Sequence, residues 1–162
     1  MHSAPRTYSG KVARAFVMVT QRSAEVTWER DLLSGSGKVR FGSRALQDTP
    51  VTWASRTEQP NGKTSPEELL AAAHASCYAM ALSATLAANK TPPTRLDVSA
   101  VCTFDKVGDA WKVTKMVLTV RGWVSGLDNA KFVDLAKKGE QTCPISNAIR
   151  NNVQIELNAS LA

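Results

Sequence analysis

Three cysteines are the residues of this 162-residue chain best suited to covalent chemistry, and each has a different local setting. Cys77 lies inside the apolar segment PEELLAAAHASCYAM, Cys102 lies in RLDVSAVCTFDKV, and Cys143 precedes a proline in QTCPIS. The thiolate, not the thiol, is the nucleophile and the metal ligand. The chemistry of the chain therefore depends on which setting can stabilise a negative charge on sulfur.

Local sequence alone favours Cys143 as the most acidic thiol. It stands where Pro144 opens a short helix, so unpaired backbone N–H groups and the helix dipole would favour its thiolate. Lys137 and Lys138 lie a few residues upstream and add positive charge. The alternative is an ordinary helix start that carries a cysteine without using it.

The other two cysteines lack such support in their own segments. Cys77 is expected in mid-helix among alanines and leucines, where burial would raise its pKa unless a cation reaches it from elsewhere. Cys102 shares one face of a predicted strand with Val98 and Phe104, where free cysteine behaves as a small hydrophobic residue. We expect Cys102 to be structural.

His74 precedes Cys77 by three residues and shares its helix face. A Cys/His pair could be a hydrolase-type nucleophile or half of a metal site, but a packed helix residue is the more common role. A structural zinc site needs four ligands, and the chain offers only two histidines and three scattered cysteines. We therefore expect no metal and no cofactor.

Composition and charge are those of an ordinary globular protein, with 43% hydrophobic residues, 21% charged residues and a formal net charge of +6. The basic residues are spread out without interleaved aromatics, so no nucleic-acid partner is expected. The N-terminus lacks the apolar run of a signal peptide, and no run approaches about 18 consecutive apolar residues. We expect a cytoplasmic protein with no membrane partner, whose cysteines are thiols and not a disulfide framework.

The first part of the chain predicts strands and then a long helix. Short segments rich in valine, threonine and aromatic residues predict an antiparallel meander over 15–20, 23–28, 37–42 and 50–55. After a loop, Ser65 is a good N-cap, Pro66 fits the first helical position, and Glu68 completes a capping box with Ser65. This helix should end near Asn89 and is apolar nearly all round, which predicts burial under a sheet and against a second subunit.

The second part predicts a hairpin followed by helices. Strands over 95–107 and 111–124 should be joined by a turn at Gly108 and Asp109. A helix should begin near Asp128 and stop at Gly139, followed by a short helix over 143–152 and a strand over 153–160. The pattern is that of an α+β fold, with antiparallel sheets around a buried central helix in one domain.

Two motifs together resemble the OsmC/Ohr family, the osmotically induced and organic hydroperoxide resistance proteins of bacteria. They are TSPEELLAAAHASCYAMALS and, 66 residues after its cysteine, TCPISNAI. VTWER and SGSGKV extend the resemblance, and the AAHASC form favours the OsmC-like subtype. The resemblance implies an OsmC-like intertwined dimer with one peroxidase domain over 23–162. Residues 1–22 would be an N-terminal extension, with an extra strand as one option.

The resemblance also implies a thiol-dependent peroxidase acting on organic hydroperoxides, with hydrogen peroxide as a further candidate. By motif position, Cys77 would attack the peroxide and Cys143 would resolve the sulfenic acid into a disulfide, which an external dithiol reduces. Glu67 would orient an arginine that keeps Cys77 as thiolate. Arg56, expected at an exposed position upstream of the helix, matches this arginine, and Arg44 is the alternative.

The spacing of these residues has a geometric consequence. Glu67 and Cys77 lie ten residues apart on what reads as one unbroken helix, or roughly 15 Å. If both serve one site, Glu67 must come from a second subunit, which predicts a homodimer with composite active sites. The competing hypotheses are a non-catalytic thiol sensor or hydrophobic-ligand-binding protein, and a Cys/His hydrolase that uses His74.

Overall fold

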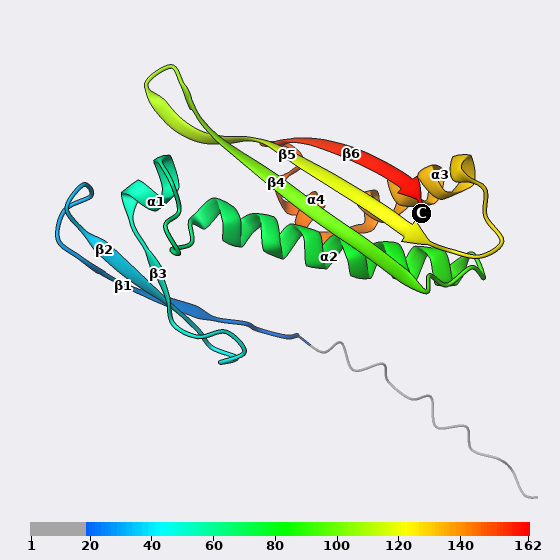
Figure 1. The fold of residues 1–162 in the computed structure, drawn as a ribbon, viewed down its shortest axis with the longest axis horizontal. Helices are drawn as coiled ribbons and strands as arrows, with labels where there is room; N and C mark the ends of the chain where they lie inside the picture. The colour runs from blue at the N-terminus through cyan, green and yellow to red at the C-terminus, as the bar shows by residue number, and fades with distance from the viewer. Residues whose placement is uncertain (1–18) are drawn as a thin grey trace, which may run out of the picture.

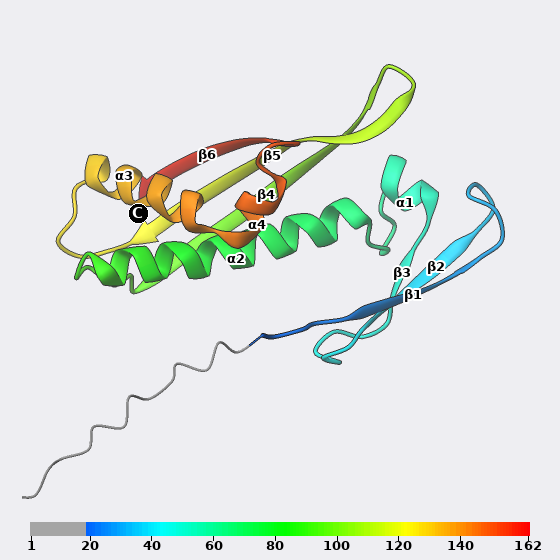
Figure 2. The same cartoon turned by 180° about the vertical axis from the view of Figure 1, so that it is seen from behind.

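The computed structural model describes residues 19–162, which form two three-stranded sheets and a long central helix. The small sheet lies at one end of the molecule, and the helix runs beneath the larger sheet (Figures 1 and 2). This is the predicted α+β fold, with antiparallel pairing in both sheets and a central helix. The predicted strand over 15–20 falls mostly outside the described residues, as does most of the predicted extension over 1–22.

The small sheet is an antiparallel meander of β1 (Ala24–Glu29), β2 (Ser36–Phe41) and β3 (Thr49–Val51). All of β1 is exposed, including Val26 and Trp28, which are 59% and 39% exposed. The apolar side chains of this strand are therefore not covered by other parts of the same chain, which is typical of a surface that binds a partner.

The predicted strand over 50–55 is wrong beyond Val51, because the chain turns into helix α1 (Trp53–Thr57). Thr52 and Ser55 form a reciprocal capping box, in which each side-chain oxygen accepts the other residue's backbone N–H at 3.0 Å. This local bonding outweighs the strand propensity of the segment. It places Arg56 in the last turn of α1 and not in an exposed loop.

The central helix α2 (Pro66–Ala88) begins and ends where the sequence predicts. Ser65 caps it by accepting the backbone N–H of Glu68, and Asn89 is its C-cap. The second half of the predicted capping box is absent, because the Glu68 carboxylate instead accepts the hydroxyl of Thr64 at 2.6 Å. The helix is continuous, so the rise between its residues can be counted directly.

The larger sheet contains β4 (Arg95–Val107), β5 (Ala110–Trp123) and β6 (Gln154–Leu161). The first two form the predicted hairpin, whereas β6 lies parallel to β5. Parallel neighbours need a crossover connection, usually helical. Here α3 (Asn129–Thr142) and α4 (Pro144–Ile149) form that crossover beside α2, as Figure 2 shows.

Helix α3 runs through Gly139, so the predicted stop at this residue is wrong. A Cβ at Gly139 would lie 3.0 Å from the Cα of Leu82 and 3.2 Å from its Cβ. Gly139 is therefore a close-packing residue inside α3 and not a terminator. It lets the end of α3 approach the middle of α2, where Cys77 lies.

The core lies between one face of α2, the larger sheet and α3. The buried side chains that form it are Tyr78, Leu82 and Leu86 from α2, Leu118 and Val120 from β5, Phe132, Leu135 and Ala136 from α3, and Cys143. This face fixes the rotation of α2, and with it the direction in which Cys77 points.

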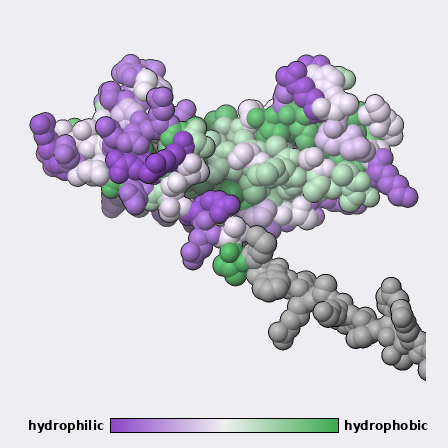
Figure 3. Space-filling view, turned by 90° about the horizontal axis from the view of Figure 1, so that it is seen from below, coloured by the Kyte–Doolittle hydropathy of each residue, from purple (hydrophilic) through white to green (hydrophobic). Residues whose placement is uncertain are grey.

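The opposite face of α2 is an exposed stripe of small and apolar residues, comprising Ala72, Ala73, Ser76, Met80, Ala84 and Ala87. Averaged over 18 residues the helix has a hydropathy of 1.4, so by length and composition alone it is apolar enough to cross a membrane, although polar residues such as His74 and Ser76 interrupt its apolar runs. The packing of its other face against the larger sheet is that of a core helix. Only 28% of that window is buried within the chain, and the middle of this side is largely hydrophobic in Figure 3.

Candidate active site

Cys77 and Cys143, called here the thiol pair, are brought together by α2 and the start of α4. Cys77 lies in the middle of α2, and Cys143 is the residue that joins α3 to α4. Burial raises the pKa of Cys77, and the adjacent Cys143 thiol raises it further, while the backbone N–H of Ile145 opposes both. Two motifs that are 66 residues apart in sequence therefore meet at one place.

The two thiols differ in access. Cys77 is half-buried, whereas Cys143 is completely buried. Solvent thus reaches part of Cys77 and none of Cys143. Local sequence predicted that burial raises the pKa of Cys77. Within one chain this pKa is raised, although the amide of Ile145, in the first turn of α4, acts in the opposite direction.

Arg56 and Glu67 form an ion pair at the N-terminal end of α2. Nε of Arg56 donates to both carboxylate oxygens of Glu67, at 2.9 and 3.1 Å, and Nη2 donates to Oε1 at 2.7 Å. The Glu67 side chain is 9% exposed and that of Arg56 is 30% exposed. Such forked contacts between a guanidinium and a carboxylate are strong and fix orientation.

Aromatic rings hold the guanidinium from the other side. The Cζ atom of Arg56 lies 4.0 Å from the ring centroid of Phe104 and 5.8 Å from that of Trp53. Trp111 stacks on Phe104 at 5.0 Å. Among residues 19–162, the alternative arginine, Arg44, forms no ion pair and lines a different depression.

The ion pair lies at an open groove of about 540 Å³ whose other walls come from α2 and β4. Its apolar members are Ala71, Ala100, Val101 and Phe104. Cys102 also lines this groove and is half-buried, on the face of β4 that the alternation predicts. Its pKa is raised by burial and by the carboxylate of Glu67, although Arg56 lines the same groove.

Within one chain the structure does not bring Arg56 to Cys77. The groups that act on the pKa of Cys77 are its own burial, Ile145 and Cys143. Because α2 is continuous, about 15 Å of helix separates Glu67 from Cys77. The four residues predicted for the site thus form two clusters of two, one at the end and one in the middle of the same helix.

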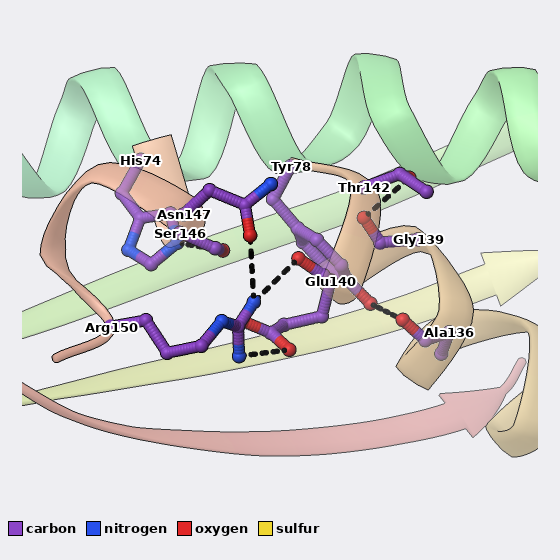
Figure 4. Close-up of polar contacts among 9 residues, drawn as sticks. All are labelled: His74, Tyr78, Ala136, Gly139, Glu140, Thr142, Ser146, Asn147 and Arg150. Carbon is purple, nitrogen blue, oxygen red and sulfur yellow. Dashed lines mark hydrogen bonds and ion pairs between the residues drawn. The ribbon is translucent and has the colours of Figure 1, made fainter. Parts of the chain in front are cut away.

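Polar contacts link α2 to the α3–α4 corner, which carries Cys143, and continue within that corner (Figure 4). Nε2 of His74 lies 2.7 Å from Oγ of Ser146, and the hydroxyl of Tyr78 donates to the carbonyl of Ala136 at 3.2 Å. Arg150 and Glu140 form an ion pair across the α3–α4 corner at 3.0 Å. His74 is packed, as its helix position predicted.

Sequence reasoning missed Ser146 and Glu140, whose only signal is closeness to Cys143 in the chain. No group of three or more possible metal ligands occurs among the described residues.

The chain matches the family model for OsmC-like protein over residues 59–158. It is 33% identical over 139 residues to Peroxiredoxin OsmC of Escherichia coli K12, an alignment that covers 86% of this chain and 96% of that protein. It is also 32% identical over 95 residues to the organic hydroperoxide resistance protein of Xanthomonas axonopodis pv. citri, covering 58% and 65% of the two chains.

Solved structures with the same fold include an organic hydroperoxide resistance protein OsmC of Legionella pneumophila, with a TM-score of 0.68 and 22% identity over 85% of this chain and 96% of that chain. An organic hydroperoxide resistance protein of Elizabethkingia anophelis has a TM-score of 0.70 and 22% identity, over 90% of this chain and 100% of that chain. At such identities the likeness concerns the fold alone.

Proposed function

This chain belongs to the OsmC-like family, and from that premise we propose that it is a thiol-dependent peroxidase that reduces organic hydroperoxides. Hydrogen peroxide is a second candidate substrate. The observation that carries the proposal is the thiol pair, in which a reachable thiol, Cys77, stands beside a buried one, Cys143. A peroxidase that forms a disulfide needs this order of access, because the outer thiol must be oxidised before the inner one attacks it.

The proposed cycle has three steps. The Cys77 thiolate attacks one peroxide oxygen, the O–O bond breaks, and the leaving alkoxide takes a proton to become an alcohol, which leaves a sulfenic acid on Cys77. The thiol of Cys143 then attacks that sulfur, an S–S bond replaces the S–O bond, and the leaving hydroxide takes the thiol proton to form water. An external dithiol reduces the disulfide by exchange.

The first step needs a cation near Cys77. Within one chain the pKa of this thiol is raised, which lowers the fraction of thiolate at neutral pH. Arg56 is always charged and can fork between a carboxylate and a thiolate. We propose that Arg56 and Glu67 of one subunit serve the Cys77 and Cys143 of its partner in a homodimer.

The exposed stripe on α2 supports this assembly. A two-fold axis near Ala72, midway between Glu67 and Cys77, would place each Glu67 beside the partner's Cys77. The exposed residues on that face are mostly alanines, and small side chains let two antiparallel helices approach closely. The exposed apolar residues of β1 would gain cover in the same intertwined dimer.

The remaining assignments follow from the surroundings of the site. The apolar walls of the groove suit an organic group on the peroxide. The chemistry needs no metal or cofactor, because sulfur carries the electrons. The reductant would be an external dithiol, and we assign the protein to the cytoplasm, where thiols stay reduced.

Turnover of cumene hydroperoxide or t-butyl hydroperoxide with a dithiol reductant tests the activity. Wild type should consume peroxide continuously, while Cys77→Ser should not exceed the rate without protein. A thiol sensor or ligand-binding protein would react once without turnover, and a hydrolase would cleave ester substrates with no need for reductant. Equal consumption by wild type and Cys77→Ser would refute the peroxidase.

Mixing two inactive variants tests the composite site. Cys77→Ser and Glu67→Ala are unfolded together and refolded, and heterodimers are isolated with two affinity tags. In a heterodimer both lesions fall in one composite site, so the other site should be intact and about half of the wild-type turnover per dimer should return. No recovery in isolated heterodimers would mean that each chain builds its own site.

A further inference from the structure

One buried hydrogen bond joins two residues that each lie three positions from a member of the thiol pair. His74 precedes Cys77 by three residues on α2, and Ser146 follows Cys143 by three residues on α4. Their side chains meet at 2.7 Å, and both residues are completely buried. The bond therefore crosses the contact between α2 and α4 about one helical turn from each thiol.

This bond is poorly explained as a device for stability alone. Nδ1 of His74 is buried and has no hydrogen-bond partner among residues 19–162, and a buried polar atom left without a partner is destabilising. An apolar pair of similar volume would avoid that cost. Burial lowers the pKa of His74, Glu140 opposes this and Arg150 adds to it, which favours a neutral imidazole in the hydrogen bond to Ser146.

The other polar contacts of the α3–α4 corner, which carries Cys143, are made within that corner. Nη1 of Arg150 donates to Oε2 of Glu140 at 3.1 Å, and Nη2 donates to the Glu140 carbonyl at 3.3 Å. The backbone N–H of Cys143 donates to that same carbonyl at 3.2 Å. Together with the Arg150–Glu140 contacts, which Figure 4 shows, this bond makes the α3–α4 corner one unit.

Helix α2 holds this corner through few polar contacts. The hydroxyl of Tyr78 reaches α3 at Ala136, but among residues 19–162 the His74–Ser146 contact is the one hydrogen bond between side chains of α2 and α4. The backbone N–H of Ile145 in α4 also reaches Cys77. The His74–Ser146 bond is thus the side-chain contact that fixes α4, and with it Cys143, along α2 without involving either thiol.

We propose that His74 and Ser146 are positioning residues for the disulfide-forming step, holding Cys143 where its thiol can attack the oxidised Cys77. The inference rests on the proposed peroxidase function and deepens it. In that step an S–S bond forms, the S–O bond of the sulfenic acid breaks, and hydroxide leaves with the thiol proton as water. The bond plays no part in the attack on peroxide, because Cys77 is fixed by α2 itself.

The test separates the two steps by rapid mixing with one equivalent of cumene hydroperoxide. Acid quench, alkylation and mass spectrometry give the fractions of reduced Cys77, of its dimedone-trapped sulfenic acid and of the disulfide. Ser146→Ala and His74→Leu remove the bond. His74→Gln can restore it, because a glutamine amide reaches about as far as Nε2, and Tyr78→Phe removes the other helix contact as a matched control.

Ser146→Ala and His74→Leu should lose reduced Cys77 at the wild-type rate but close the disulfide on the order of ten- to a hundredfold more slowly, so the dimedone adduct accumulates. His74→Gln should recover most of the closure rate, and Tyr78→Phe should leave the ratio of the two rates unchanged. A general loss of stability would not separate the two steps.

Three results would overturn the inference. Closure at the wild-type rate in both bond-deleting variants removes the positioning role and leaves the peroxidase intact. Equal slowing in Tyr78→Phe makes the effect one of general packing. If wild type itself forms neither sulfenic acid nor disulfide, the proposed function fails and this inference fails with it.

Discussion

The two reactive regions along α2, its N-terminal end and its middle, differ in the groups that they contain. At its N-terminal end, Arg56 is fixed by three hydrogen bonds to Glu67 and by the ring of Phe104, but the thiol within its own groove is Cys102, whose pKa is raised. In the middle of the helix, the thiol pair has two sulfurs, no cation is among the described groups that act on the pKa of Cys77, and the nearby Arg150 is paired with Glu140. Each region has what the other lacks.

The difference shows how reactivity can be kept out of a single chain. A preformed ion pair needs no rearrangement when a thiolate arrives, which is the condition under which electrostatic stabilisation is most effective. A thiol with a raised pKa reacts slowly with oxidants and electrophiles. Under the composite-site proposal, Cys77 of an unassembled subunit would therefore react slowly with oxidants and electrophiles.

The largest expected effect comes from separating the two regions. Ala72→Glu would place two carboxylates against each other at the proposed two-fold axis, so the protein should become monomeric and lose peroxide turnover to the level of Cys77→Ser. Sedimentation and the peroxide assay measure the two outcomes. Ala87→Glu, on the same exposed stripe but about 22 Å away along the helix, is the control and should stay dimeric.

A monomeric and fully active Ala72→Glu would break the comparison, because each chain would then supply its own cation. A variant that stays dimeric would locate the interface away from this stripe.

The next largest effect concerns the cation alone. Arg56→Ala should raise the pKa of Cys77, so that thiolate absorbance near 240 nm develops at higher pH and peroxide reacts about a hundredfold more slowly at pH 7. The sign follows from the thiolate being the reactive form. Since Glu67 is then left nearly buried without its partner, unfolding should become easier by about 1–3 kcal/mol.

Arg56→Lys keeps the charge without the fork and should fall between wild type and Arg56→Ala. Superimposed titration curves for wild type and Arg56→Ala would assign the thiolate to another cation, with Arg44 the first to test.

The sequence predicted the elements whose signals are local. Ser65, Pro66 and Asn89 bound α2 as expected, and Gly108 turns the β4–β5 hairpin. The sequence misled at Gly139, because a glycine that ends a helix and one that lets two helices touch look alike until the neighbour, Leu82, is known.

The site was less accessible to local reasoning. Local sequence predicted that burial raises the pKa of Cys77, which agrees with the structure, but the direction of the Ile145 amide could not be read from spacing. Arg56 was named through the family resemblance, and the structure then paired it with Glu67. The parallel placement of β6 depends on a crossover of two helices, which no local pattern marks.

A smaller effect should follow from loosening Arg56 without removing it. Phe104→Leu deletes the ring over the guanidinium, a contact of about 1 kcal/mol, so the rate of peroxide reaction should fall roughly fivefold. Trp53→Leu, which removes the more distant ring at 5.8 Å, is the comparison and should cost less. The reverse order would show that Phe104 does not position the arginine.

The smallest effect is expected at the third thiol. Oxidation with one equivalent of peroxide should link Cys77 to Cys143 within one chain and leave Cys102 free, and Cys102→Ser should form the same link in the same yield. Peptide mapping under non-reducing conditions checks the pairing. A Cys77–Cys102 link would instead mean that the groove thiol of one subunit resolves the sulfenic acid of the other.

The crossover between the parallel strands β5 and β6 carries Cys143, whereas Cys77 lies upstream of the whole hairpin. A bond between them would enclose 65 residues of chain, the second half of α2, β4, β5 and α3 included. Closing a loop of that length stabilises a fold by about 4 kcal/mol, or on the order of 10 °C in melting temperature. Oxidised molecules would then resist heat and proteases better than reduced ones. Proteolysis in the cell would therefore remove reduced molecules faster, and these are the copies that have met no peroxide.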